Sequence, residues 1–379
     1  MTFYGDRYHI NLNSPPQLRE LFYNQLGKVP TKWTDGGKTG NKQPSTDGDV
    51  LQEWADDGDR HASILLKHRA LSKTYSTYVK GLQEQVGPDF KIHPTLNQHV
   101  TVTSRLSCVD PNLQNIPRPA SDKFRLRDSF IASPGKVLIV ADYSQLEMLI
   151  LAHKSGDENM IKAILEGKDL HCFAVSLVFG YKYEDVIAAK KKEKKVGWEG
   201  LSATERLMLL LRQAMKNTGY GVIYGIGPKK LARDLTDEYS KVDPNRIVTK
   251  EEAAGYIEQW FDAFPSVRAY RDYQINYVRQ HGKVSTFLGH IRRLPTIHSN
   301  RWSDRSEAER QAVNIIQGDA ADIVKITMMA LEYDEELNTC GYKQILQIHD
   351  EIVGEVDDDP EVIKKVIARK KYLMENTFD

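Results

Sequence analysis

The stretch YKQILQIHDEIVGEV, residues 342–356, decides how the C-terminal part of the chain folds. Two apolar runs, residues 342–348 and 351–356, predict β-strands on either side of His349-Asp350-Glu351. Three ionisable residues inside a hairpin are costly unless a ligand or a partner offsets the cost. The pattern therefore predicts a strand pair that presents carboxylates for chemistry, with a tight turn that binds nothing as the alternative.

A second short apolar run also ends in an acid. Residues 136–141, KVLIVA, predict a buried strand that stops at Asp142. Asp142 could meet Asp350 around divalent cations, because Mg²⁺ takes few carboxylates and completes its shell with water and substrate phosphates. A turn or capping role for Asp142 is the plainer alternative.

A third cluster lies on one predicted helix, residues 207–224, which is followed by Gly225, a typical C-terminal stop. Arg212, Lys216, Tyr220 and Tyr224 are each four residues apart and so share one face. Two cations followed by two rings would match a phosphate chain followed by a base. An amphipathic helix with solvated charges and core aromatics remains the alternative.

The rest of the chain is mostly helical by pattern. We expect helices over residues 50–78, 158–180, 250–281, 307–336 and 360–376, an extended polar segment over 94–117, and a strand or hairpin arm over 286–293. Residues 181–206 form a charged interruption that includes the lysine run 190–195, KKKEKK. The interruption is interpreted as a solvated surface insertion, with a nucleic-acid contact as the alternative.

Composition sets broad limits on the class of protein. The chain has 379 residues, of which 40% are hydrophobic and 27% charged, and this balance excludes disordered, collagen-like and coiled-coil classes. The 52 Lys and Arg residues equal the 52 Asp and Glu residues, which does not exclude a nucleic-acid partner because charge distribution matters more than its sum. Three scattered cysteines, Cys108, Cys172 and Cys340, predict neither a disulfide framework nor a zinc site.

The sequence contains no apolar run long enough to span a bilayer, and its first residues lack the apolar core of a signal peptide. We therefore expect no membrane association and a location in the cytoplasm or the interior of a host cell.

The three clusters gain meaning together. Two metal-binding carboxylates and a helix with cations and aromatic rings predict a two-metal nucleotidyl-transfer site. Two ions there would lower the pKa of an attacking hydroxyl and hold a pyrophosphate leaving group.

At these residues the sequence resembles the family A DNA polymerases. Four segments carry the resemblance, in the family's order: SRLS at 104–107 with PNLQNIP at 111–117, DYSQLE at 142–147 (motif A), Arg212, Lys216, Tyr220 and Tyr224-Gly225 (motif B), and His349-Asp350-Glu351 (motif C). Four motifs in the right order form a specific signal, which none of them is alone.

The resemblance implies an α+β, right-hand polymerase fold with an antiparallel palm sheet, helical fingers and a partial helical thumb. It implies four parts: residues 1–93 as partial thumb and thumb–palm connection, 94–157 as the first palm part with motif A, 158–281 as fingers with motif B, and 282–379 as the second palm part with motif C.

The resemblance also implies roles for individual residues. Asp142 and Asp350 would hold two Mg²⁺ ions, with the Tyr143 carbonyl as a further ligand, and Arg212 and Lys216 would complete the catalytic set. The residues implied to bind the deoxynucleoside triphosphate are Gln145, Glu147, His171, Arg212, Lys216, Tyr220 and Tyr224. Among these, Glu147 would exclude a 2′-hydroxyl and Tyr220 would pack on the incoming base.

Primer-template DNA is the second implied partner. The residues that would contact it are Arg105, Asn112, Gln114, Asn314, Gln317, His349 and Glu351. The duplex contacts would lie in the minor groove, where shape and common acceptors are read without sequence preference.

Several positions depart from the family pattern. Leu149 stands where the family has Arg two residues after the motif A Glu, so a local ion pair is expected to be missing. Between Arg310 and Gln317 the chain is one residue shorter than the pattern, and one residue turns a helix by about 100°. That turn puts simultaneous DNA contacts by Asn314 and Gln317 in doubt. We interpret the chain as a fragment of a polymerase of viral or phage-like origin, without a proofreading exonuclease.

The predicted function is DNA-directed DNA synthesis on a primer 3′-hydroxyl during replication. One alternative is an enzyme similar to single-subunit RNA polymerases, against which Glu147 argues. A truncated, non-catalytic nucleic-acid-binding relative is another, and both retained carboxylates argue against it. A metal-dependent nuclease would leave the helix with Arg212 and Lys216 unexplained.

Overall fold

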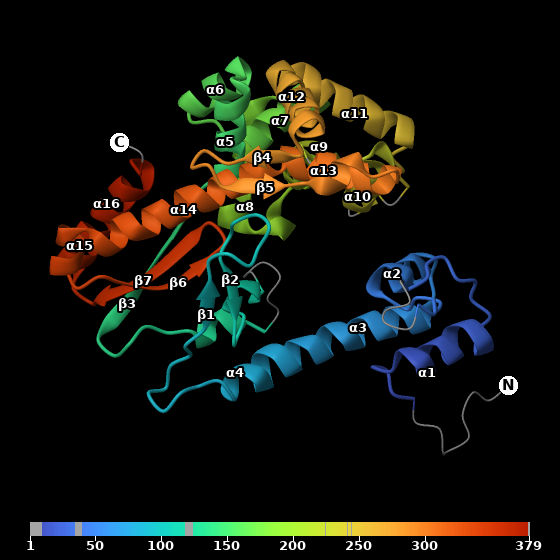
Figure 1. Cartoon of the computed structure of the whole chain (residues 1–379), viewed down its shortest axis with the longest axis horizontal. Helices are drawn as coiled ribbons and strands as arrows, with labels where there is room; N and C mark the ends of the chain where they lie inside the picture. Colours follow the sequence, from blue (N-terminus) through green and yellow to red (C-terminus); the bar gives the residue numbers. More distant parts are fainter. Residues whose placement is uncertain are drawn as a thin grey trace. The chain divides into compact units, whose positions relative to one another are not determined.

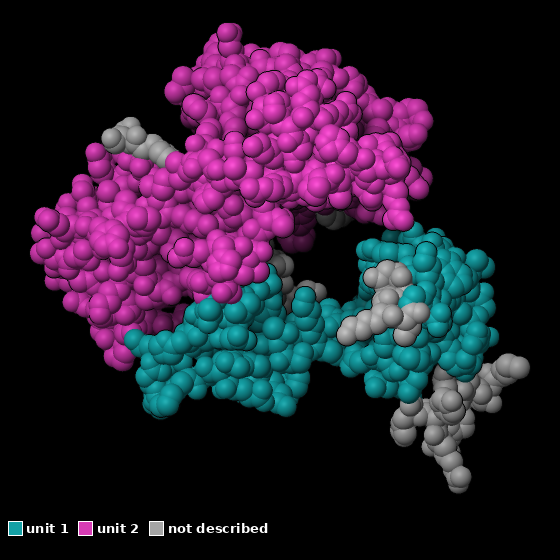
Figure 2. Space-filling view, viewed as in Figure 1, with its two compact units in different colours: residues 1–95, 108–129 teal, residues 96–107, 130–379 magenta. Residues whose placement is uncertain are grey.

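The structure is a computed structural model that describes residues 10–34, 40–117, 124–223, 225–240, 242–243 and 245–377. Within helix α9 the side chains at positions 217, 218, 220, 222 and 223 lie outside this description. The chain divides into two compact units, one made of residues 1–95 and 108–129 and the other of residues 96–107 and 130–379 (Figure 2).

The first unit is a small helical unit with its own core. Its helices are α1 (Pro15–Arg19), α2 (Gly48–Asp56), α3 (Arg60–Thr74) and α4 (Gly81–Gln83), with π-helical turns over Glu20–Gln25 and Tyr75–Lys80. Phe22 and Trp54 stack at its centre, with ring centroids 5.0 Å apart. The prediction of one helix over residues 50–78 is wrong, because Gly58 takes φ +86° and Asp59 starts a new helix by accepting from the Ala62 amide.

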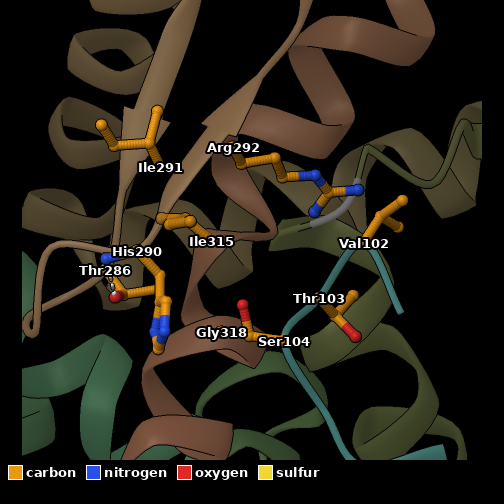
Figure 3. A pocket seen from close by; sticks show the side chains of 9 residues that line it. All are labelled: Val102, Thr103, Ser104, Thr286, His290, Ile291, Arg292, Ile315 and Gly318. Carbon is orange, nitrogen blue, oxygen red and sulfur yellow. Dashed lines mark hydrogen bonds between the residues drawn. The ribbon is translucent and has the colours of Figure 1, made fainter. Parts of the chain in front are cut away.

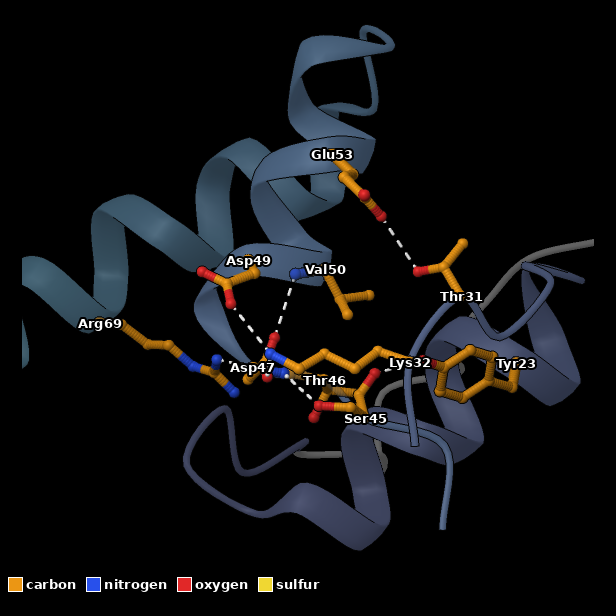
Figure 4. A network of polar contacts seen from close by, with 10 residues as sticks. All are labelled: Tyr23, Thr31, Lys32, Ser45, Thr46, Asp47, Asp49, Val50, Glu53 and Arg69. Carbon is orange, nitrogen blue, oxygen red and sulfur yellow. Dashed lines mark hydrogen bonds and ion pairs between the residues drawn. The ribbon is translucent and has the colours of Figure 1, made fainter. Parts of the chain in front are cut away.

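A polar network ties a loop of this unit to α2 and α3 (Figure 4). The ammonium of Lys32 bridges Asp47 and Asp49 at 2.7 and 2.9 Å, and these acids lie at the start of α2. The guanidinium of Arg69 on α3 donates to the carbonyl of Thr46 at 2.7 Å. Asp47 and Asp49 also interact favourably with the positive end of the α2 dipole, so both charge and hydrogen bonding stabilise the start of this helix.

The second unit is built around a three-stranded antiparallel sheet (Figure 1). Its strands are β3 (Lys136–Asp142), β6 (Lys343–Ile348) and β7 (Glu351–Asp357), in the order β3-β7-β6. Seven residue pairs join β3 to β7, from Lys136 opposite Asp357 to Asp142 opposite Glu351. The strands predicted from the apolar runs are confirmed to within one residue at each end.

Five of the described helices pack in this part of the unit. They are α5 (Leu146–Ser155), α13 (Trp302–Val313), α14 (Ile315–Tyr333), α15 (Glu335–Thr339) and α16 (Pro360–Glu375). Ile139, Leu151, Ile352 and Val366 are among the apolar side chains buried in the shared core. Lys370 of α16 is also buried, and its ammonium donates to the Ile139 and Ile352 carbonyls at 3.0 and 2.7 Å.

The prediction of a single helix over residues 307–336 is wrong. The helix breaks at Asn314, whose ψ of 10° ends α13 before α14 begins. Around the break, Ala312 and Ile315 are buried in a small core with Val284, whereas Val313 and Ile316 are buried in the main core.

The remaining helices pack around α9 (Ala203–Ile223), which contacts α7, α8 and α10. They are α6 (Glu158–Leu165), α7 (Leu170–Phe179), α8 (Tyr183–Val196), α10 (Pro228–Ser240), α11 (Lys250–Ala263) and α12 (Pro265–His281). The strand pair β4 (Lys283–Ser285) and β5 (Ile291–Arg293) follows, and β1 (Thr95–Asn97) and β2 (Ser107–Val109) lie where the chain passes between the units. Residues 250–281 are helical as predicted, in two helices that meet at Phe264-Pro265, because proline cannot continue the α11 hydrogen bonds.

Candidate active site

The two acids predicted to share a site come together at one end of the three-stranded sheet. Asp142 ends β3 directly opposite Glu351, the first residue of β7. The next amide, that of Tyr143, donates to the Asp350 carbonyl at 3.2 Å. Backbone pairing therefore places Asp142 beside the turn that carries Asp350, although the two lie far apart in the sequence.

The turn that carries Asp350 has a fixed backbone shape. His349 is exposed and takes a left-handed conformation with φ 57°, which is uncommon for a residue with a side chain. The buried side chain of Gln347 donates to the His349 carbonyl, and this hydrogen bond stabilises the turn. Gln145, three residues after Asp142, is also left-handed with φ 57° and starts α5. Asp350 thus directly follows one of these uncommon conformations, and Asp142 lies three residues before the other.

Arg105 connects two of the predicted site residues. Its Nη2 lies 2.6 Å from Glu147 Oε1 and 3.8 Å from Asp350 Oδ1. Glu147 is 7% exposed, so its carboxylate is held in a largely dry position by this cation. Leu149, which stands where the family has an arginine, is 37% exposed. Glu147 is paired with Arg105 instead of with an arginine at position 149.

The side chain of Tyr143 points away from the acids. Its hydroxyl hydrogen-bonds the Thr327 hydroxyl at 2.6 Å and donates to the Met374 carbonyl at 2.9 Å. Burial raises the pKa of the Tyr143 hydroxyl. This anchor ties the end of β3 to α14 and α16, and only the backbone of Tyr143 is left for a ligand beside Asp142.

A second cluster of charges gathers at the start of α7. Asp169 caps this helix, and its Oδ1 accepts from the amides of His171 and Cys172 at 3.0 Å each. Its Oδ2 binds Arg212 Nη2 at 2.7 Å and Lys190 Nζ at 2.8 Å. Burial would raise the pKa of the Asp169 carboxyl, but the two cations outweigh it and hold that pKa well below its usual range.

His171 follows Asp169 on α7 and is 2% exposed. Burial lowers its pKa to about 4, and the nearby cations Arg212 and Lys216 act in the same direction. The imidazole is therefore neutral at physiological pH. Arg212, Lys216 and His171, predicted as the triphosphate-binding group, thus lie in one electrostatic neighbourhood formed by α7 and α9.

Two predicted aromatic residues fall outside what the structure describes. Tyr220 lies in α9, but its side chain is not described, and Tyr224 lies outside the described residues. Asp169 was missed by the sequence analysis. The available signal was an Asp, a residue type typical of a helix cap, but it lies inside the range 158–180 that was predicted to be helical.

The predicted DNA-contacting residues are divided between the units. Asn112 and Gln114 belong to the first unit, where the Asn112 side chain accepts from the Gln114 amide at 3.1 Å and starts a short 3₁₀ turn. In the second unit Asn314 lies at the break between α13 and α14 and Gln317 lies in the first turn of α14, and both are half-buried. The chain is therefore not one straight helix from Arg310 to Gln317, the segment that is one residue shorter than the family pattern.

A small polar recess lies where the loop of residues 102–104 meets α14 and the β4–β5 hairpin (Figure 3). Gly318 is needed there, because a Cβ at this position would lie 2.7 Å from the Thr286 methyl group. His290 lies on the same recess and pairs through Nδ1 with the buried Asp322 at 2.6 Å. The recess carries hydrogen-bonding groups on a rigid frame.

The residues at the sheet end fit a site for Mg²⁺ better than one for a tightly chelated metal. Within the described ranges no group of three or more His, Cys, Asp or Glu side chains is gathered as a ready metal site. Asp142 is exposed and Asp350 is half-exposed, so both can reach a ligand. Two carboxylates that leave most of the shell to water and phosphate are typical of Mg²⁺.

Comparison with known proteins decides the family. The sequence model of DNA polymerase family A matches residues 2–201 and 197–379. The chain belongs to DNA polymerase family A. DNA polymerase I of Streptococcus pneumoniae strain TIGR4 is 38% identical over 374 residues, which cover 98% of this chain and 38% of that protein. Thermostable DNA polymerase I of Thermus thermophilus is 36% identical over 373 residues, which cover 97% of this chain and 40% of that protein.

A solved structure in this family has the same fold. The POL domain of Pol1 from M. smegmatis, in a complex with DNA primer-template and dNTP, matches with a TM-score of 0.78 and 34% sequence identity. The match covers 98% of this chain and 59% of that one. It confirms the predicted α+β, right-hand polymerase fold.

This family A chain spans about two fifths of the length of the curated relatives named above. None of the helices in the described part of the chain is long and apolar enough to cross a membrane. Members of the family generally use divalent metal ions.

Proposed function

We propose that this chain catalyses template-directed DNA synthesis, adding deoxynucleotides to the 3′-hydroxyl of a primer and releasing pyrophosphate. Its partners are primer-template DNA and deoxynucleoside triphosphates, as the solved relative's complex suggests. The observation that carries the proposal is the convergence of Asp142 and Asp350 at one end of the β3–β7 ladder in a chain of this family.

In this proposal Asp142, Asp350 and the Tyr143 carbonyl hold two Mg²⁺ ions. When bound, the ions lower the pKa of the attacking hydroxyl and stabilise charge on the leaving pyrophosphate. Arg212 and Lys216 neutralise the triphosphate and His171 accompanies them, which is consistent with their shared neighbourhood on α7 and α9.

Selection of the sugar falls to Glu147. Its carboxylate is buried and fixed by Arg105, so it presents a rigid obstacle to a 2′-hydroxyl. Gln145, Tyr220 and Tyr224 complete the nucleotide site in this proposal. Arg105, Asn112, Gln114, Asn314, Gln317, His349 and Glu351 are assigned to the DNA, and the thumb, palm and fingers boundaries expected from the sequence belong to the same proposal.

Primer extension tests the proposal. The chain is incubated with a labelled primer on a defined template, the four deoxynucleoside triphosphates and Mg²⁺, and products are separated by length. Extension that depends on the template and on Mg²⁺ supports the proposal. A chain that binds the duplex and the nucleotide but never lengthens the primer contradicts it.

A further inference from the structure

We propose that Lys190 of α8 is a positioning residue for nucleotide binding, because it holds the charge of Asp169 while Arg212 turns to the triphosphate. The inference rests on the proposed function and adds a residue that no motif of the chain includes. Lys190 belongs to the charged interruption that the sequence suggested to be a solvated insertion.

The first observation is that one carboxylate oxygen has two cations. Oδ2 of Asp169 lies 2.7 Å from Arg212 Nη2 and 2.8 Å from Lys190 Nζ. The carboxylate side chain is 12% exposed, whereas those of Arg212 and Lys190 are 21% and 34% exposed. The acid is thus the fixed, largely dry member of the cluster, and the cations reach it from α9 and α8.

The second observation is that Asp169 cannot move toward either cation. Its other oxygen is occupied by the amides of His171 and Cys172 at the start of α7. Its own amide donates to the hydroxyl of Tyr183, the first residue of α8, at 3.0 Å. Helix α8 is therefore docked on Asp169 through two separate contacts, one from Tyr183 at its start and one from Lys190 near its middle.

A charge argument connects these contacts to the nucleotide. Arg212 can give its full charge and hydrogen bonds to a phosphate only if it loosens its hold on Asp169. A buried carboxylate that loses its only cation is strongly disfavoured. Lys190 remains paired with the same oxygen. Arg212 can therefore leave Asp169 without leaving a buried carboxylate unpaired. Without Lys190, Asp169 would compete with the triphosphate for Arg212.

A neighbouring lysine provides a matched control. Lys192 lies two residues along α8 and pairs with Glu205 at 2.8 Å, at the start of α9. It has a similar exposure of 44%, but it joins α8 to α9 rather than to the start of α7, and its ion pair does not involve Asp169. The inference predicts that only the lysine on Asp169 affects the nucleotide.

The test measures single-nucleotide insertion by the 379-residue chain with Mg²⁺ and dATP, together with the Kd of dATP by calorimetry. Lys190→Met should raise the KM and Kd for dATP about tenfold, the change that one lost charge contact typically produces, with kcat within about twofold. Lys190→Arg should restore both constants, and Lys192→Met should leave them unchanged.

A double variant separates positioning from simple support of the fold. In Asp169→Asn the carboxylate charge is gone while a side-chain oxygen still caps α7, so adding Lys190→Met should raise KM no further. This comparison also decides the matter if Lys190→Met alone does not fold. An unchanged KM in Lys190→Met, an equal rise in Lys192→Met, or a rise that persists on the Asp169→Asn background would overturn the inference.

The proposed function and the inference fail in different ways. If the wild-type chain binds dATP but does not extend a primer, the polymerase proposal fails and the Kd values still decide the role of Lys190. If the wild-type chain extends primers while Lys190→Met keeps its KM and Kd, only the inference fails. A wild-type chain that binds no dATP overturns both.

Discussion

The guanidinium of Arg105 lies 2.6 Å from the carboxylate of Glu147, so a residue assigned to the DNA and a residue assigned to the nucleotide form one ion pair. The same guanidinium is 3.8 Å from Asp350. A single cation therefore links Glu147, the carboxylate proposed to select the sugar, to one of the two acids at the sheet end. Any change at Arg105 should affect sugar selection and catalysis together.

Replacing Glu147 tests its role as the obstacle to ribose. Glu147→Ala should lower discrimination against ribonucleotides by at least about tenfold, because removing the side chain opens space for a 2′-hydroxyl. Glu147→Gln keeps the volume and can still accept from Arg105, so it should retain most of the discrimination. Insertion rates with ATP and dATP opposite the same template base give both ratios, and equal ratios in all three proteins would refute the role.

The two acids can be tested without disturbing the sheet. Asp142→Asn and Asp350→Asn should each reduce primer extension by about a thousandfold or more, because an amide is a poor substitute for a carboxylate toward Mg²⁺. Duplex affinity, measured by fluorescence anisotropy, should change by less than about twofold. Asp357→Asn, at the opposite end of the same ladder, is the control and should extend primers normally. Parallel loss of duplex binding would argue against a role in metal binding.

The buried pair of Lys154 and Asp319 predicts a large effect on stability. Lys154 Nζ lies 2.5 Å from the carboxylate of Asp319, which is fully buried and also accepts from the Phe287 amide at 2.8 Å. Lys154→Met should lower the free energy of unfolding by about 3–5 kcal/mol, because it leaves a buried charge without its partner. Lys136→Met removes an exposed pair and should change the urea midpoint little. Full recovery of the lost stability in Lys154→Met/Asp319→Asn would identify the charge as the cause, and no loss in Lys154→Met would contradict the argument.

Lys370 predicts a pH dependence of stability. Burial lowers the pKa of its ammonium from 10.5 to about 8 in the folded chain. Between these two values the unfolded chain keeps a proton that the folded chain has released, so the contribution of Lys370 to stability rises with pH. Urea midpoints at pH 7.5 and 9.5 should therefore increase more in the wild type than in Lys370→Met. Equal slopes in the two proteins would show that the ammonium titrates normally.

The strands and their acids could be predicted because their signals are local. Residues 136–141 and the runs around Asp350 are short, apolar and bounded by polar residues, and such runs have few alternative structures. Arg212 and Lys216 could be placed on one face because α9 is a regular helix. In each case the information lies within a few residues of the feature.

The helix breaks and the paired charges could not be predicted, because they depend on distant packing. The residues next to Asn314 bury against two cores, Val313 and Ile316 in one and Ala312 and Ile315 in the other, and this packing is not visible in the local sequence. Nothing around Lys190 distinguishes it from Lys192, and its pairing with Asp169 appears only once α8 has docked on α7. Both lysines form ion pairs while remaining partly exposed, at 34% for Lys190 and 44% for Lys192.

The unbroken pairing of β3 with β7 has a mechanical consequence. Asp142 and the turn before Glu351 are joined by the main chain rather than by side chains that can swing. The backbone that carries the two acids is therefore expected to stay fixed. Movements during a reaction cycle are expected in the helices that face the acids. Substitutions that speed or slow turnover without touching substrate should accordingly accumulate on those helices and spare the ladder.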